Sequence, residues 1–150
     1  MPKSKKPNLR RVAGMLAHTE LASTDPEATR RFLEKVFKWN LKEVETPTGR
    51  LIRYQTPGGA RGSIRGTRPK EAPAAINYIL VEDIESTASM IKRSRGEILK
   101  PIVDVPQMGR FFWFKVPGGP VLAAWQDAAD REDSSAWRRQ VRRASRRRRP

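Results

Sequence analysis

The chain has 150 residues, the size of one ordinary domain, and a formal net charge of +15 at pH 7. It contains no cysteine, which excludes disulfides, thiolate metal sites and a cysteine nucleophile. No apolar run is long enough to cross a membrane, and the basic N-terminus lacks the apolar segment of an export signal. We therefore expect a cytoplasmic protein with no membrane partner.

The positive charge is concentrated at the two ends of the chain. Of the 31 Lys and Arg residues, five lie in residues 1–12 and eight lie in residues 138–149, and neither segment contains an acid. The remaining 18 cations face 16 acids, so the rest of the chain is nearly neutral. We expect a flexible basic arm over residues 1–12 and an Arg-rich tail over residues 127–150, and we assign any function of the basicity to them.

The first structured stretch is predicted to be a strand that runs into a capped helix, over roughly residues 14–38. Alternation before Asp25 places His18 and Glu20 on one face, the period-two pattern of a half-buried strand. Asp25 is a good N-cap and is followed by a proline, which suits the first helical position. An apolar stripe at helical spacing follows, made of Ala28, Phe32, Leu33, Val36 and Phe37.

Three predicted strands follow this helix and give the order β, α, β, β, β. Turn compositions at residues 46–49 and 57–59 separate the strands, and residues 67–74 have the composition of a linker. The expected strands cover residues 41–45, 50–56 and 61–66.

The same order repeats after the linker. Asp83 caps a second expected helix, which Arg95 and Gly96 end as a glycine C-cap would. The expected strands cover residues 76–81, 97–103, 110–116 and 121–126, with a loop at 104–109. The two capping Asp residues are 58 positions apart, and the two Pro-Gly-Gly turns are 60 apart. We therefore predict an α+β fold of two tandem βαβββ modules, about 14–66 and 75–126.

Several segments resemble the vicinal oxygen chelate superfamily, the group of glyoxalase I, bleomycin-resistance proteins and extradiol dioxygenases. The resemblance covers about residues 14–126 and implies one glyoxalase/bleomycin-resistance-like domain over residues 13–126. It also implies a curved mixed sheet around a cup-shaped cavity, a homodimer, and lyase- or isomerase-type chemistry. The segments that carry it are His18–Leu21, Asp25–Ala28, Phe32–Trp39, Val81–Ile84, Gly96–Ile98, Val105–Arg110 and Gly119.

The same resemblance implies a divalent metal held by residues on the first and last strands of each module. His18 matches the first of these positions, while the others offer Ser63 or Arg65, then Ile76, then Ala123. Glu20 could add a carboxylate beside His18. A catalytic Zn²⁺, Ni²⁺ or Fe²⁺ needs several converging imidazole or carboxylate ligands. We therefore predict no metal site and no cofactor, with a divalent metal left open by the resemblance alone.

Strand alternation predicts which side chains face the cavity. If His18 faces it, Glu20 does too, and the apolar residues of the third strand in each module should face the helices instead. Their alternates, and the equivalent positions of neighbouring strands, should line the cup. The predicted ligand-binding residues are Arg53, Gln55, Ser63, Arg65, Tyr78, Trp113 and Lys115.

These residues suggest a function. Their cations outnumber Glu20, and together with Trp113 they would suit a small anionic metabolite or drug with a flat or apolar part. The alternative is that the cations lie on an open, solvated face. His18 and Glu20 are the predicted catalytic residues, with His18 as acid or base and Glu20 orienting it or abstracting a proton next to a carbonyl. The alternative is that neither has a chemical role.

The eight Arg residues of 138–149 suggest a second function of a different class. They could neutralise several phosphates and bind nucleic acid without sequence preference. The protein would then be nucleic-acid-associated, with the rest of the chain as a catalytically inactive scaffold. The alternative is a solvated tail without a defined partner.

Overall fold

The structure is a computed structural model that describes residues 10–46 and 49–128. Most of the expected basic arm and nearly all of the expected Arg-rich tail lie outside the described residues. In chain order the elements are β1 (Leu16–Ser23), α1 (Pro26–Phe37), β2 (Asn40–Thr46), β3 (Gly49–Gln55), β4 (Arg61–Gly66), β5 (Ala74–Leu80), α2 (Ile84–Arg93), β6 (Glu97–Ile98), β7 (Val103–Val105), β8 (Gly109–Lys115) and β9 (Val121–Asp127).

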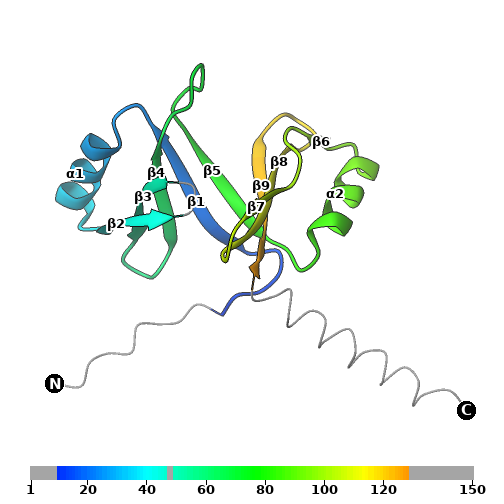
Figure 1. Cartoon of the computed structure of the whole chain (residues 1–150), viewed down its shortest axis with the longest axis horizontal. Helices are drawn as coiled ribbons and strands as arrows, with labels where there is room; N and C mark the ends of the chain where they lie inside the picture. The colour runs from blue at the N-terminus through cyan, green and yellow to red at the C-terminus, as the bar shows by residue number, and fades with distance from the viewer. Residues whose placement is uncertain (1–9, 47–48, 129–150) are drawn as a thin grey trace, which may run out of the picture.

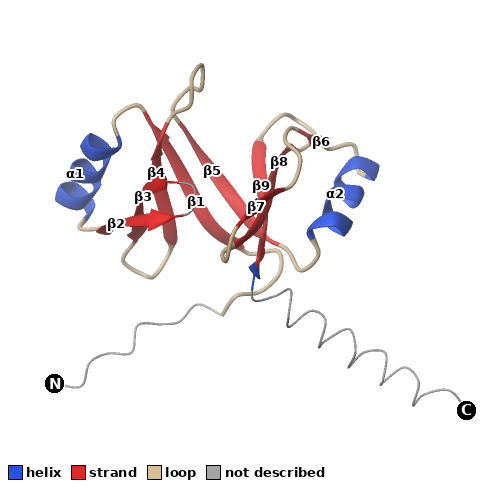
Figure 2. Cartoon of the chain, in the orientation of Figure 1, coloured by secondary structure: helices blue, strands red, loops and turns tan. Residues whose placement is uncertain are grey.

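The described strands form one mixed sheet in the order β2-β3-β4-β1-β5-β9-β8-β6, with β7 also paired to β8. Each module pairs its first and last strands in parallel, β1 with β4 and β5 with β9. The modules join where β1 and β5 run antiparallel, with Thr19 opposite Asn77. The sheet curves, and α1 and α2 lie on its two outer sides (Figures 1 and 2). The predicted α+β fold of two βαβββ units is confirmed.

Both helices begin where local chemistry predicts. The Asp25 side chain accepts a hydrogen bond from the backbone N–H of Ala28 at 3.0 Å, and Asp83 does the same for Ser86 at 2.9 Å. These bonds satisfy N–H groups that have no partner within the helix.

The end of α2 differs from the predicted glycine C-cap. Arg95, with a φ of 67°, takes the left-handed conformation in place of Gly96. Gly96 is required for space, because a Cβ there would lie 2.5 Å from Cγ2 of Ile91. The glycine therefore allows close approach of the chain to the helix instead of a left-handed turn.

The single strand predicted over residues 97–103 is wrong, as is part of the loop predicted over 104–109. The chain forms two short strands, β6 and β7, which pair with opposite ends of β8. Pro101 lies between them and has no N–H to donate to a neighbouring strand, which favours an interruption there. The resulting loop brings Lys100 to the concave side of the sheet, where it lines the cavity.

The core consists of separate clusters on the two faces of the sheet. Tyr54 and Ile52 are buried in one cluster with Leu33 of α1, and Phe112 and Phe114 are buried in another with Ile84 of α2. Ile52, Phe112 and Phe114 face the helices, as alternation predicts. Tyr54 was expected to face the helix too, but its side chain also lines the cavity. A third buried cluster forms the floor of the concave side and contains Ile76, Tyr78 and Ala123.

Candidate functional site

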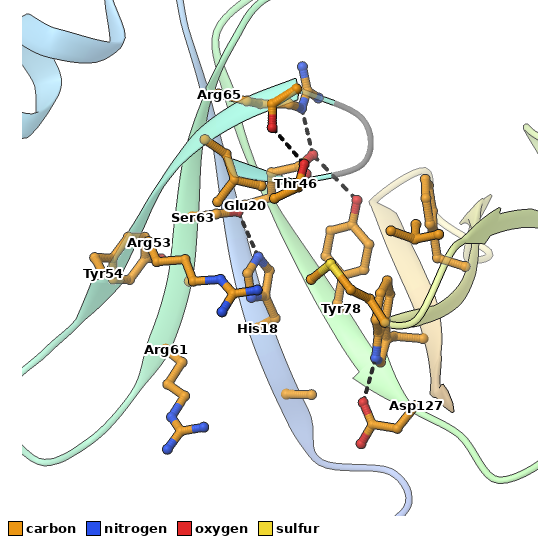
Figure 3. Close-up of a pocket in the computed structure, with 18 of the residues that line it drawn as sticks. His18, Glu20, Thr46, Arg53, Tyr54, Arg61, Ser63, Arg65, Tyr78 and Asp127 are labelled. Atoms are coloured by element: carbon orange, nitrogen blue, oxygen red, sulfur yellow. Dashed lines mark hydrogen bonds and ion pairs between the residues drawn. The ribbon is translucent and has the colours of Figure 1, made fainter. Parts of the chain in front are cut away.

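The concave face of the sheet encloses a cavity of about 870 Å³. This volume is in the range of small-molecule binding sites. Strands of both modules line it, and Figure 3 shows their side chains converging from β1, β3 and β4 on one side and from β5 on the other.

The two walls of the cavity differ in chemistry. The first module supplies a cationic wall, which we define as Lys42, Arg50, Arg53, Arg61 and Arg65. The second module supplies an apolar wall, which we define as Val103, Val105, Met108, Phe111 and Trp125. Among the lining residues described, the second module's charged side chains are Lys100 and Asp127.

His18 lies on β1 and is bonded to a neighbouring strand. Its Nε2 is 2.7 Å from the hydroxyl oxygen of Ser63 on β4, and the edge of its ring meets Tyr78 at a centroid distance of 5.6 Å. Burial lowers the pKa of His18 below its ordinary value of 6.5, and nearby Arg53 lowers it further, against the opposing charge of Glu20. The imidazole is therefore neutral at neutral pH and can accept a proton.

Glu20 shares the face of His18 but has different hydrogen-bond partners. Its Oε1 accepts a bond from Nε of Arg65 at 2.8 Å and one from the hydroxyl of Tyr78 at 3.3 Å (Figure 3). Trp113 in turn donates from Nε1 to the Tyr78 oxygen at 3.1 Å. The carboxylate is thus the centre of a buried polar network that crosses the junction between the modules.

Arg65 also anchors the segment that links the modules. Its two terminal nitrogens bond both oxygens of Glu71 at 2.6 and 2.9 Å, and Glu71 accepts a third bond from the backbone N–H of Arg68 at 3.0 Å. The Arg65 guanidinium, helped by the Arg68 N–H, lowers the pKa of Glu71 to about 2. This arrangement fixes the turn that carries Arg68 over the cavity.

Five of the seven predicted ligand-binding residues line the cavity, namely Arg53, Gln55, Ser63, Arg65 and Tyr78, as do both predicted catalytic residues, His18 and Glu20. Trp113 is half-buried against the floor cluster, with cationic side chains over its ring. Lys115 is exposed at the end of β8 and is not among the lining residues.

Several lining residues were missed by the sequence prediction. Arg61 and Trp125 could have been found, since each is two residues from a position already assigned to the cup, Ser63 and Ala123. Phe111 follows from Trp113 in the same way. Lys100, Arg68 and Arg11 lie in loops, where no periodicity identifies the direction of a side chain.

Four positions correspond to those that hold the metal ion in the family that the sequence resembles. Ile76 and Ala123 present only hydrocarbon in the floor cluster, and Ser63 is bonded to His18. Arg65 is a cation paired with two carboxylates. Within residues 10–46 and 49–128, no group of three or more His, Cys, Asp and Glu residues could hold a metal ion. This donor set does not fit a divalent metal centre.

Membrane insertion through helices finds no support in the described part of the chain. Neither described helix has the length and apolarity needed to span a bilayer.

Comparisons with known proteins agree with the geometry. The profile of the Glyoxalase/Bleomycin resistance protein/Dioxygenase superfamily matches residues 15–123. A curated relative, the putative glyoxylase CFP32 of Mycobacterium tuberculosis, is 24% identical over 113 residues. The match covers 71% of this chain and 43% of that protein, so the chain spans less than half the length of this relative.

Similar solved structures share the fold at low identity. Methylmalonyl-CoA epimerase from Mycobacterium tuberculosis has a TM-score of 0.61 at 13% identity, covering 81% of this chain and 94% of that one. A superfamily member from Vibrio splendidus has a TM-score of 0.55 at 19% identity, covering 73% of this chain and 96% of that one.

Proposed function

Because the chain belongs to the glyoxalase/bleomycin resistance protein/dioxygenase superfamily, we propose that it binds a small anionic molecule with a flat apolar body in its cup, without a metal ion. The observation that carries this proposal is the difference between the cationic wall and the apolar wall of one cavity. A ligand with a charged end and an apolar end would satisfy both walls at once.

The cationic wall contains guanidinium groups that are not paired with any carboxylate of residues 10–46 and 49–128. Arg53 and Arg61 both line the cavity, and no described carboxylate lies within ion-pair distance of either. Figure 3 shows both side chains extending from β3 and β4 on the side of the cavity that holds His18. An Arg side chain can hold a carboxylate through two charge-assisted hydrogen bonds. These residues would bind the charged end of the ligand.

The apolar wall is held in place by its own contacts. The rings of Phe111 and Trp125 stack with an interplanar angle of 18° and a centroid distance of 6.3 Å. Trp125 donates from Nε1 to Asp127 at 2.6 Å, and Arg11 bonds both oxygens of Asp127 at 2.6 and 2.9 Å. A planar body could lie against this fixed aromatic surface with little loss of side-chain entropy.

A lyase- or isomerase-type reaction in this cup would rest on His18. Its neutral imidazole faces the cavity and could accept a proton from a carbon next to a ligand carbonyl. Glu20 is already bonded to Arg65 and Tyr78, so we assign it the role of positioning these two residues. Homodimer formation and a cytoplasmic location remain predictions.

The proposal is tested by titrating the protein with benzoate and 2-naphthoate and measuring the binding heat. We expect saturable binding that weakens about tenfold in Arg53→Met and in Arg61→Met, the cost of a lost charged hydrogen bond. Arg31→Met is the matched control, because Arg31 is exposed on α1, away from the cavity. Absence of binding, or an equal effect of the control, would contradict the proposal.

A further inference from the structure

Three cationic side chains converge on a single indole ring at one end of the cup. The guanidinium carbons of Arg65 and Arg68 lie 5.7 and 5.3 Å from the centroid of Trp113, and Nζ of Lys100 lies 5.5 Å from it. All three cations line the cavity. One ring can attract one cation over each face, so a third cation in the same place requires another explanation.

The three cations differ in how many of their N–H groups donate hydrogen bonds to the protein. Arg65 donates to Glu20, to both oxygens of Glu71 and to the backbone oxygen of Gly66. The side chains of Arg68 and Lys100 donate to no other described residue, and no described carboxylate lies within ion-pair distance of them. Two positive charges therefore face the cavity with all their N–H donors available.

The surroundings of Lys100 disfavour its charged form. Lys100 is half-buried, and burial together with the charges of Arg68 and Arg65 lowers its pKa below the ordinary value of 10.5, although the nearby charges of Glu20 and Glu71 partly oppose this shift. Like charges in one partly buried site repel each other. A bound anion would reduce this repulsion and accept hydrogen bonds from both side chains.

We propose that the ligand of the cup carries a phosphate or phosphonate group, which binds between Arg68 and Lys100 over the ring of Trp113. The inference rests on the proposed function and names a further anionic group of its ligand, besides the group held by Arg53 and Arg61. Because Glu20 and Glu71 share Arg65, the cluster of three cations and two carboxylates carries a net charge of +1. Arg68 and Lys100, the two cations without a described carboxylate partner, could both donate to the oxygens of one phosphate group. The fork of Arg68 and the ammonium of Lys100 also approach from different chain segments, which suits a tetrahedral group with three acceptor oxygens.

The position of this subsite is compatible with the apolar wall. Nζ of Lys100 lies 5.9 Å from the centroid of Phe111 as well as 5.5 Å from that of Trp113. A phosphate beside Lys100 would therefore place an attached planar body next to Phe111 and Trp125. The cations Arg53 and Arg61, on the opposite wall, remain available for a second polar group of the same ligand.

The experiment measures the affinities of phenyl phosphate, phenylphosphonate, inorganic phosphate and benzoate for the full chain by calorimetry. We expect phenyl phosphate to bind more tightly than benzoate, and its affinity to fall about tenfold in Lys100→Met and in Arg68→Met. Benzoate affinity should change by less than about threefold, the size of a screened charge effect. Lys92→Met, on the exposed end of α2, is the control and should change neither.

The possible failures are distinguishable. If Arg53→Met weakens every ligand while Lys100→Met and Arg68→Met bind phenyl phosphate as the unaltered chain does, the phosphate subsite is overturned and the proposed function stands. If no member of the panel binds, both are overturned.

A purely structural role of Lys100 makes a different prediction. If Lys100 were present to stabilise the Trp113 ring, Lys100→Met would lower the unfolding midpoint without ligand and leave phosphate affinity unchanged. That pair of results would overturn the subsite. We expect instead that the midpoint without phosphate is unchanged or raised, because the substitution removes a like-charge contact. The rise in midpoint on adding phenyl phosphate should be lost.

Discussion

His18 is the single histidine of the chain, and its surroundings in the cup lower its pKa. Burial disfavours its charged form, Glu20 favours that form, and Arg53 and Arg11 disfavour it. These influences come from three different parts of the chain. The sequence therefore identifies the residue but not the balance of charges around it.

This balance can be measured without ambiguity because no other histidine contributes a signal. We predict a His18 pKa below 6.5 in an NMR titration of the folded chain. Glu20→Gln should lower the pKa further, and Arg53→Met should raise it.

The sign for stability follows from the same shift. Because the folded-state pKa is the lower one, the unfolded chain binds the proton first, and folding stability should fall as the pH decreases below 6.5. His18→Gln should remove this part of the pH dependence in urea unfolding. A His18 pKa at or above 6.5 would contradict the prediction and show that the charge of Glu20 offsets the burial of the imidazole.

The residues of the cup were predictable where they lie on strands and unpredictable where they lie on loops. Arg53, Ser63 and Arg65 were found because alternate side chains of a strand share a face. The same rule chose Lys115, which lies at the end of β8, outside the lining. Parity gives the face of a side chain but not its position along the cup. The position of Lys100 in the cavity depends on the break between β6 and β7 at Pro101, and residues in such a break show no hydrophobic periodicity from which the direction of a side chain could be predicted.

At the scale of elements, β4 shows why a small residue is needed inside the sheet. Tyr54 reaches across this strand from β3 and donates its hydroxyl to the backbone oxygen of Thr19 at 2.9 Å. The ring passes directly over Gly62, where a Cβ would lie 2.0 Å from the Tyr54 ring and 2.2 Å from the Thr19 oxygen. Any side chain here must displace the tyrosine that separates the core from the cup.

Two glycines of β4 provide a matched test. Gly62→Ala should lower the free energy of unfolding by about 3 kcal/mol, the upper range for overpacking a core. Gly66→Ala, in the same strand, adds a Cβ that meets nothing within 4 Å and should change it by less than about 0.5 kcal/mol. Urea unfolding measures both. Equal effects of the two substitutions would mean that Tyr54 can leave its position without cost.

Elements were predicted well where a local chemical signal starts them. Asp25 and Asp83 each cap a helix through their own side chain, so short segments of sequence suffice. The split between β6 and β7 depends on pairing with β8, a contact between distant segments. At the end of α2, Arg95 takes the left-handed conformation, and Gly96 provides the space for close packing against Ile91. Composition alone predicts instead that the glycine takes the left-handed conformation.

At the scale of the whole molecule, the two modules have the same topology but opposite chemistry. Their strands pair in the same way, yet the first module carries the cationic wall and the second the apolar wall. The tandem order was visible from the spacing of capping residues and turns. The asymmetry was not, because three residues of the apolar wall, Val103, Val105 and Met108, lie in β7 and the turn after it, where the sequence predicted the end of one strand and a loop. The 18 cations and 16 acids between the two basic ends nearly cancel, so the net charge of this region does not reveal the difference between the two walls.

The positive charge outside residues 13–137 leads to the last prediction. Removing residues 134–150 removes eight of the 31 cations and no acid, which lowers the formal charge from +15 to +7. We predict that any binding of duplex DNA by the full chain, measured by electrophoretic shift at about 50 mM salt, is lost in a chain that ends at Asp133 and declines steeply at about 200 mM salt. Binding of arene anions in the cup should be unaffected, because the described lining residues all lie at or before Asp127. A shortened chain that still shifts DNA would place the nucleic-acid contact on the basic residues 1–12 or on the cationic wall. Competition between DNA and small anions for the cup would identify the cationic wall.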